Sequence, residues 1–262
     1  MISKNQIKFI RSLELRKNRR QSGLFIAEGP KVVGDLMKRQ LPAWVVATPE
    51  WLQAEWAPVA GNRKDVGEVQ VMEVTEEELK RVSCLQHPQK VLALFALPDA
   101  GDEGNRDGLI GDDRLLLALD GVQDPGNMGT IIRIADWFGI DTILCSPDTA
   151  DAFNPKVVQA TMGSIARVRL VYTDLVAFCR TLPADYPVYG TLLDGSDIYR
   201  QPLTAHGIIV MGNEGKGISP ALRQLVNRRL LIPQFGGAVG AESLNVAIAT
   251  AITLAEFRRR VR

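Results

Sequence analysis

The stretch LLLALDGVQDPGNMGTIIR, residues 115–133, decides the fold. It opens with five apolar residues, turns at Asp124-Pro125-Gly126 and continues into a helical pattern. A short apolar run of this kind is typical of a strand in a parallel sheet, because both faces of such a sheet are covered by helices. Similar runs, most of them separated by helical segments, follow at 142–145, 168–171, 188–192, 207–211 and 229–232. Residues 114–262 are therefore predicted to form an α/β domain with a mostly parallel sheet and helices on its faces.

The residues before this stretch predict a smaller α/β domain. Strand-like runs at 24–27, 44–47, 69–74 and 91–97 are interrupted by helical patterns at 30–38 and 76–82. Residues 98–113, PDAGDEGNRDGLIGDD, hold four glycines and six acids, a composition typical of a flexible linker. The predicted organisation is a small domain at 1–97, a linker at 98–113 and a second domain at 114–262.

Composition excludes several classes of protein. The chain has 262 residues, of which 46% are hydrophobic and 23% charged, as in ordinary globular proteins. No apolar run is long enough for a membrane span, and the first twenty residues lack an apolar signal core, so a cytoplasmic protein is expected. Cys84, Cys145 and Cys179 lie far apart without CxxC spacing. They are predicted to be free buried thiols, with no disulfide framework and no metal site.

Positive charge is concentrated at the N-terminus. Residues 1–39 hold ten basic and three acidic side chains, a net charge of +7, whereas the whole chain carries only +1. Such a segment can bind nucleic acid through its phosphates, and Arg16, Lys17, Arg19 and Arg20 are the candidate RNA contacts. A solvated amphipathic helix explains the charge pattern equally well.

The last helical segment, residues 243 to about 260, is apolar on nearly every side until Leu254. A helix of this kind must be enclosed, either inside its domain or in a subunit interface. Ser243 is the expected N-cap, which would leave free amide groups near the preceding loop.

Three polar motifs each follow a predicted strand, where open α/β sheets bind their ligands. The first contains Asn127, Gly129 and Arg133, and the second is GNEGKG at 212–217. The third runs from Ile232-Pro233 through the glycine-rich residues 234–242 to Ser243-Leu244-Asn245. Each motif by itself could be an ordinary turn or helix cap. The second is no phosphate-binding P-loop, because valine occupies position 210, where that motif needs its first glycine.

In order, spacing and residue identity, the three motifs together closely resemble those of the SpoU (TrmH) family in the SPOUT superfamily. Its members are ribose 2′-O-methyltransferases of tRNA and rRNA. The resemblance spans essentially all of residues 114–262. A weaker resemblance at Lys8–Arg20 and Phe25–Lys31 points to the RNA substrate-binding domain that many rRNA-directed members carry.

This resemblance implies properties that the residue pattern alone does not predict. The C-terminal part of the sheet domain would form a trefoil knot, an exception to the general rule against knots, and the chain would act as a homodimer. The knot loops would bind S-adenosylmethionine, largely through backbone groups of Thr191, Leu192, Gly212, Ile232 and Leu244. The loop at 234–242 is rich in glycine for a segment that should contact the cofactor, and we expect it to close on binding.

By the same resemblance the catalytic residues would be Asn127, Arg133, Glu214, Ser243 and Asn245. Asn127, Ser243 and Asn245 would orient the ribose and the arginine, and Glu214 would anchor the arginine or take part in proton transfer. Because an arginine side chain is effectively always protonated, Arg133 is expected to hold a phosphate and lower the pKa of the ribose hydroxyl rather than act as a base. Methyl transfer of this kind needs no metal.

Two alternative functions belong to other classes of protein. A non-catalytic RNA-binding or ribosome-assembly protein on the same scaffold would have no need to keep every polar motif residue together. A dinucleotide-binding oxidoreductase would need a GxGxxG sequence after its first strand, and the chain has none there. The basic N-terminal domain favours rRNA over tRNA as the substrate, since it adds reach on a large folded RNA.

Overall fold

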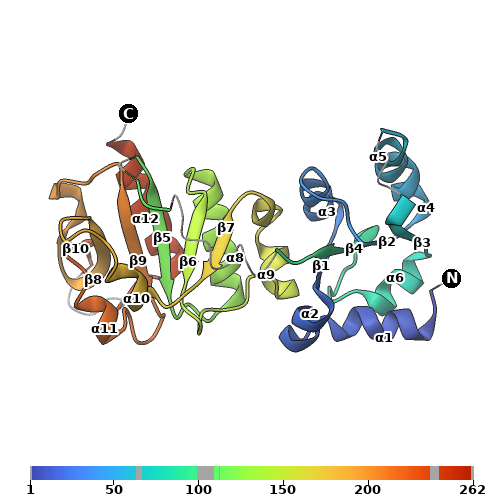
Figure 1. Ribbon diagram of the computed structural model, residues 1–262, viewed down its shortest axis with the longest axis horizontal. Coiled ribbons are helices and arrows are strands. Elements are labelled where there is room, and N and C mark those ends of the chain that lie inside the picture. The colour runs from blue at the N-terminus through green and yellow to red at the C-terminus, as the bar shows by residue number, and fades with distance from the viewer. Residues whose placement is uncertain (1, 63–66, 99–108, 112, 237–241, 261–262) are drawn as a thin grey trace. The chain divides into compact units, whose positions relative to one another are not determined.

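The computed structural model describes residues 2–62, 67–98, 109–111, 113–236 and 242–260, and Figure 1 shows the order of its elements. The chain divides into two compact units. The first comprises Met1–Pro98 and Asp151–Ala166, and the second comprises Asp99–Ala150 and Arg167–Arg262. Most of the predicted linker, and residues 237–241 of the predicted cofactor loop, lie outside the described residues.

A mixed four-stranded sheet forms the centre of the first unit. Its strand order is β1-β4-β2-β3, with β4 antiparallel to both β1 and β2, and β3 parallel to β2. Side chains alternate between its two buried faces, so that Val45 and Phe95 join one core cluster and Val46 and Leu94 join the other. The four predicted strands are confirmed as β1 (Leu24–Glu28), β2 (Trp44–Ala47), β3 (Gln70–Glu73) and β4 (Val91–Ala96).

Helices cover both faces of this sheet, and local capping explains where two of them begin. Ser3 with Gln6, and Thr75 with Glu78, form reciprocal capping boxes at the starts of α1 and α6. The helical elements of this part of the chain include α1 (Lys4–Ser12), α2 (Arg16–Ser22), α3 (Pro30–Met37), α4 (Pro49–Trp51), the π-helix η1 (Leu52–Trp56), α5 (Ala57–Asn62) and α6 (Glu76–Val82).

The first unit also contains a segment from the middle of the second domain's sequence. This segment, Asp151–Ala166, holds α9 (Pro155–Ala160) and the short helix η3 (Ser164–Ala166). The Phe153 ring lies 4.9 Å from the Phe25 ring, and Val158 and Ile165 belong to the same apolar cluster as Phe25. The connection between two strands of the second unit therefore helps to build the core of the first.

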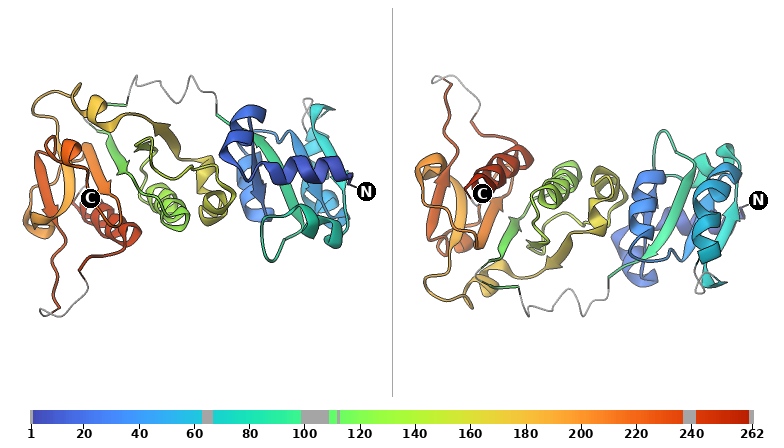
Figure 2. Two further views of the ribbon diagram at one scale, coloured as in Figure 1. Left: turned by 90° about the horizontal axis from the view of Figure 1, so that it is seen from below. Right: turned by 90° about the horizontal axis from the view of Figure 1, so that it is seen from above.

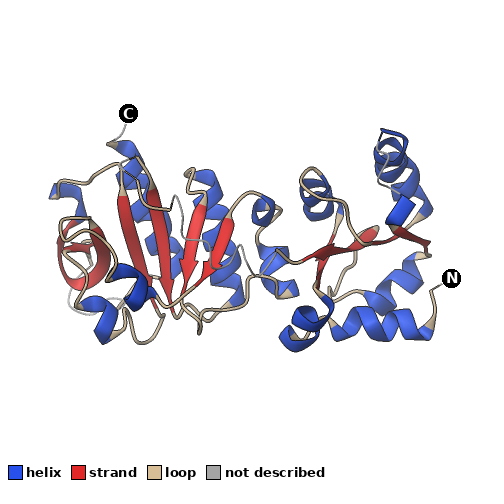
Figure 3. Cartoon of the chain, viewed as in Figure 1, coloured by secondary structure: helices blue, strands red, loops and turns tan. Residues whose placement is uncertain are grey.

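A six-stranded sheet with the order β10-β8-β9-β5-β6-β7 forms the centre of the second unit, and Figure 3 shows its strands in red. Every neighbouring pair is parallel, which confirms the predicted mostly parallel α/β domain. The strands are β5 (Leu115–Asp120), β6 (Thr142–Cys145), β7 (Arg169–Tyr172), β8 (Val188–Asp197), β9 (Gly207–Gly212) and β10 (Arg228–Leu231).

Helices α8 and α12 pack against each other along one face of this sheet, as Figure 2 shows, whereas α10 and α11 contribute to the apolar cluster on the other. The start of α12 corrects a prediction, because Asn245 rather than Ser243 is its N-cap. The helices of the second unit are α8 (Pro125–Trp137), α10 (Leu175–Cys179), the short helix η4 (Ile198–Arg200), α11 (Pro220–Arg223) and α12 (Val246–Arg259).

All three cysteines are free, as predicted, but burial is confirmed for only two of them. Cys145 and Cys179 are buried, Cys84 is partly buried, and none of the three is in a disulfide. Burial raises the pKa of Cys84 to about 12 and that of Cys179 to about 11, so neither thiol is a nucleophile near neutral pH. None of the helices in the described part of the chain is both long and apolar enough to cross a membrane.

Candidate active site

The first two motifs meet at one edge of the six-stranded sheet. They follow β5 and β9, which are parallel neighbours paired up to Asp120 and Gly212, so their loops leave the same edge. Asn213 joins the two loops by donating from Nδ2 to the carbonyl of Gly121, at 2.6 Å. A Cβ at Gly212 would overlap the backbone of residues 217–218, so only glycine fits where the second loop folds back.

Glu214 fastens the second loop to the start of α8. Its carboxylate accepts a hydrogen bond from Asn127 Nδ2 at 3.0 Å and longer ones, of 3.4 Å, from the backbone amides of Gln123 and Asp124. Asp124 is the N-cap of α8 and accepts from the Asn127 amide at 2.8 Å. The predicted tight turn is thus the first turn of a helix, and the Asn127 side chain is left free to face Glu214.

Asn245 brings the third motif to the same place. Its Nδ2 donates to Asn127 Oδ1 at 2.8 Å, while its Oδ1 accepts from the amides of Ala247 and Ile248 at the start of α12. One directional chain of hydrogen bonds therefore runs from Asn245 through Asn127 to Glu214. Each of the three motifs contributes one residue to this chain, which we call the amide relay.

Arg133 lies outside the amide relay. It is exposed on α8, and it forms no hydrogen bond or ion pair with the residues that the structure describes. It comes six positions after Asn127, about one and two-thirds helical turns, so the two side chains leave different sides of the helix. In this structure Glu214 is hydrogen-bonded to Asn127 and not to Arg133. The guanidinium of Arg133 is therefore available to an external anion. Ser243, also exposed, precedes the cap of α12.

The residues predicted to bind the cofactor lie on neighbouring elements. Strand β8 pairs with β9 only from Val188 to Gly190, so the backbone of Thr191 and Leu192 departs from that ladder beside the end of β9. Backbone groups released from a ladder are free to bind a ligand, which fits a cofactor recognised through main-chain contacts. Ile232 directly follows β10, the other neighbour of β8, and half-exposed Leu244 precedes the relay residue Asn245.

Two supports of this site were not predicted from the sequence. Asn213 lies inside the second motif, and that position was the only sequence signal for it. Ser146 and Thr149 follow β6, and their side-chain oxygens accept hydrogen bonds from the Gly121 amide, at 2.8 and 3.2 Å. No motif marks these two hydroxyl residues, because their role depends on β6 lying beside β5.

The predicted RNA contacts on α2 divide into two groups. Lys17 and Arg20 are exposed, and Arg16 lies 3.6 Å from Asp151 with 40% of its side chain exposed. Arg19 is only 2% exposed, and its guanidinium is bonded to Asp151 and to two backbone carbonyls. Because Arg19 cannot reach a phosphate without leaving these partners, its part in this structure is to hold the fold of the first unit.

The fold and the site define an α/β protein with a ligand site beyond the carboxyl ends of its parallel strands. Residues 114–255 match the SpoU rRNA Methylase family, and residues 4–93 match the MRM3-like substrate binding domain. The first match covers more than half of the chain, so the chain belongs to the SpoU rRNA methylase family.

Whole-length relatives agree with this assignment. The chain is 32% identical to the 23S rRNA (guanosine(2553)-2′-O)-methyltransferase of Bacillus subtilis over 98% of its own length and 97% of the relative. A crystal structure of an rRNA methyltransferase from Sinorhizobium meliloti with bound S-adenosylmethionine is 31% identical, with a TM-score of 0.83 over 100% of this chain and 98% of that one. A TrmH-family protein from Porphyromonas gingivalis is 42% identical, with a TM-score of 0.82 over 99% of both chains.

The protein is an RNA ribose 2′-O-methyltransferase that uses S-adenosylmethionine, as the motifs predicted. The trefoil knot stays a prediction.

Proposed function

We propose that this enzyme methylates the 2′-hydroxyl of a guanosine in 23S rRNA, in the cytoplasm where that RNA is assembled. The support is the relative from Bacillus subtilis, which is named for this reaction and matches both units of the chain. A relative from Neisseria meningitidis, 34% identical over 56% of the chain, is named a 23S rRNA (guanosine-2′-O-)-methyltransferase as well. The MRM3-like substrate binding domain at residues 4–93 fits a large folded RNA.

Mass-spectrometric mapping of ribose methylation tests the target. Total RNA from cells with and without the gene is digested and compared, and one 2′-O-methylguanosine of 23S rRNA is expected to disappear when the gene is absent. Restoring the gene must restore that nucleotide. Loss of a methyl group from tRNA alone, with 23S rRNA unchanged, would refute the proposed target.

The observation that carries the catalytic assignment is the amide relay. Bound S-adenosylmethionine supplies a methyl group activated by its positive sulfur. In this proposal the relay fixes the Glu214 carboxylate, and Glu214 accepts the proton of the ribose hydroxyl. Ser243 and Asn245 border the ribose, while Arg133 binds the nucleotide phosphate and stabilises negative charge that develops on the hydroxyl oxygen.

A double-mutant cycle tests whether Asn127 and Glu214 act together. We expect Asn127→Ala and Glu214→Gln each to lower kcat at least about tenfold, because the first removes the hydrogen bond that holds the carboxylate and the second removes the carboxylate that accepts the proton. The double variant should be no slower than the slower single variant, since residues that act as one unit have non-additive effects. Multiplicative losses in the double variant would contradict a shared role. The binding constant for S-adenosylmethionine, measured by calorimetry, should be unchanged in all three.

We also propose that the enzyme is a homodimer joined through α8 and α12. These helices pack side by side, and they expose Trp137 (84%) and Ile248 (51%), which are large apolar side chains. Apolar groups of this size on adjacent helices are typical of a subunit interface. Ile248→Glu should therefore convert a dimer to a monomer in analytical ultracentrifugation. Leu193→Glu, a change at a still more exposed leucine of β8 (77%), should leave the dimer intact.

A further inference from the structure

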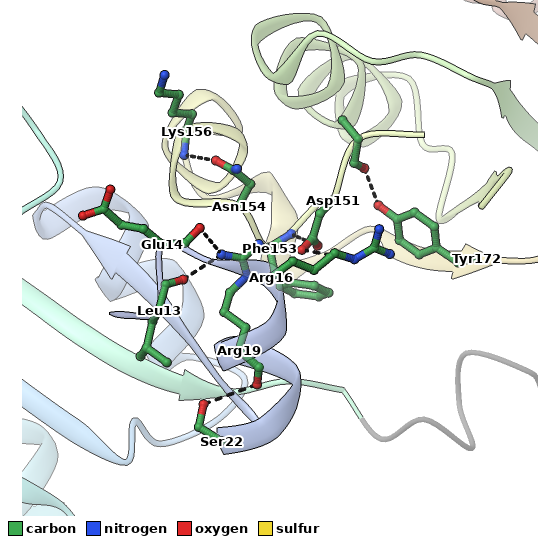
Figure 4. A network of polar contacts seen from close by, with 11 residues as sticks. Leu13, Glu14, Arg16, Arg19, Ser22, Asp151, Phe153, Asn154, Lys156 and Tyr172 are labelled. Carbon is green, nitrogen blue, oxygen red and sulfur yellow. Dashed lines mark hydrogen bonds and ion pairs between the residues drawn. The ribbon is translucent and has the colours of Figure 1, made fainter. Parts of the chain in front are cut away.

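The connection between β6 and β7 adds a lysine to the first unit. Lys156 lies on α9, which packs against β1, and its side chain is exposed. Figure 4 shows this side chain extending away from Arg19. Its backbone amide donates to Asn154 Oδ1 at 2.9 Å, and its ammonium group has no partner among the described residues. Lys156 lies within the part of the sequence that matches the methylase family, outside the substrate-binding match at 4–93.

An ion pair between buried Arg19 and partly buried Asp151 fixes this segment to α2. Arg19 donates from one nitrogen to Asp151 Oδ2 at 2.6 Å, and from another to the carbonyls of Leu13 and Glu14 at 2.6 and 2.8 Å, as Figure 4 shows. The other carboxylate oxygen of Asp151 accepts the Phe153 amide at 3.0 Å. A charged group so buried is costly to separate from its partner. The Arg19–Asp151 pair therefore holds the start of the segment in one place relative to α2.

The cations around this pair outnumber the acids. Asp151 pairs with both Arg19 and Arg16. The other two cations of α2, Lys17 and Arg20, are exposed and have no acidic partner among the described residues. Lys156 is a third exposed cation without a described acidic partner. Several such cations on one unit attract a polyanion, and the phosphates of RNA release counterions when they bind them.

We propose that Lys156 is a phosphate contact of the first unit, whose other exposed cations include Lys17 and Arg20, and that the Arg19–Asp151 pair positions it. This rests on the proposed function, in which the first unit binds rRNA. The surface that holds the substrate then includes residues from the catalytic part of the sequence. Arg19 acts on RNA binding without touching RNA.

Filter binding of an in vitro 23S rRNA transcript to the full-length protein tests the role of Lys156. We expect Lys156→Gln to weaken binding about three- to tenfold at moderate salt. It should also reduce the slope of log K against log salt by about 0.7 to 0.9, the value for one lost phosphate contact. Lys80→Gln removes an exposed lysine of α6 in the same unit, without a described acidic partner, and should change neither quantity. A slope for Lys156→Gln equal to that of wild type, or an equal change in Lys80→Gln, would overturn the proposal.

Asp151→Asn tests the positioning role of the Arg19–Asp151 pair, because the two explanations predict opposite changes in RNA affinity. Removing a negative charge should tighten RNA binding if only net charge matters, whereas loss of the pair should weaken it by releasing the segment. We expect binding at least about threefold weaker, with unchanged affinity for S-adenosylmethionine. Tighter binding would refute the positioning role. If Asp151→Asn does not fold, Lys156→Gln, a surface change, still decides the contact. A wild-type protein that neither binds nor methylates the transcript would instead refute the proposed 23S target.

Discussion

At the scale of single residues, Arg133 separates a catalytic role from a structural one most sharply. It has no partner among the described residues, so its removal should have little effect on the free energy of unfolding. If it stabilises the developing charge on the ribose oxygen, Arg133→Ala should lower kcat at least about a hundredfold, roughly 2.7 kcal/mol. Arg133→Lys should recover little of this, because lysine lacks the planar two-pronged geometry that binds phosphate. Turnover is measured with tritiated cofactor and a methylatable RNA.

The matched control for Arg133 is Arg180, another exposed arginine of the second unit, which follows α10. Arg180→Ala should leave kcat and thermal stability unchanged. Near-normal turnover in Arg133→Ala would remove Arg133 from the mechanism and leave Asn127 and Glu214 as its catalytic residues.

At the scale of elements, the basic end of α12 stabilises the fold through ion pairs with a buried carboxylate. Glu256 is buried, and hydrogen bonds from Arg259 and then Arg260 lower its pKa to about 2, against the opposing effect of burial. A carboxyl group whose pKa is lower in the folded state contributes stability above its unfolded pKa of about 4.5 and loses it as the pH falls towards 2. Glu256→Gln should therefore lower Tm at pH 7, and its difference from wild type should vanish near pH 2. Glu73→Gln, at an exposed carboxylate of β3, should show no such dependence.

At the scale of the whole molecule, the segment Asp151–Ala166 makes the stability of the first unit depend on residues of the second domain's sequence. Val158 is buried in the core that contains Phe25. Val158→Ala should destabilise that core by about 1 to 3 kcal/mol and speed amide hydrogen exchange in β1 and β4, while β5 and β6 keep their protection. Val171→Ala, at the buried position of the edge strand β7, should instead speed exchange in β5 and β6 and leave β1 and β4 protected. Equal effects on both sheets in either variant would contradict two separately stable cores.

By itself the sequence determined the strands, the class of fold and the three motifs. Apolar runs such as 115–119 and 142–145 are local signals, because a strand buried on both faces must be apolar along its length. The motifs are local as well, since each stands directly after a strand and keeps its own spacing. These properties need no knowledge of which segments meet, and the structure and the family match confirm them.

Only the tertiary structure decided which of these residues touch. The bond between Asn127 and Asn245 spans 118 positions, and that between Arg19 and Asp151 spans 132, so no local pattern reports either. Arg19 and Lys17 look alike in the sequence, yet the first is buried against an acid and the second is exposed. The physical reason is that burial and pairing arise from packing between distant segments. The choice between a phosphate contact and a structural ion pair is therefore made only when the chain has folded.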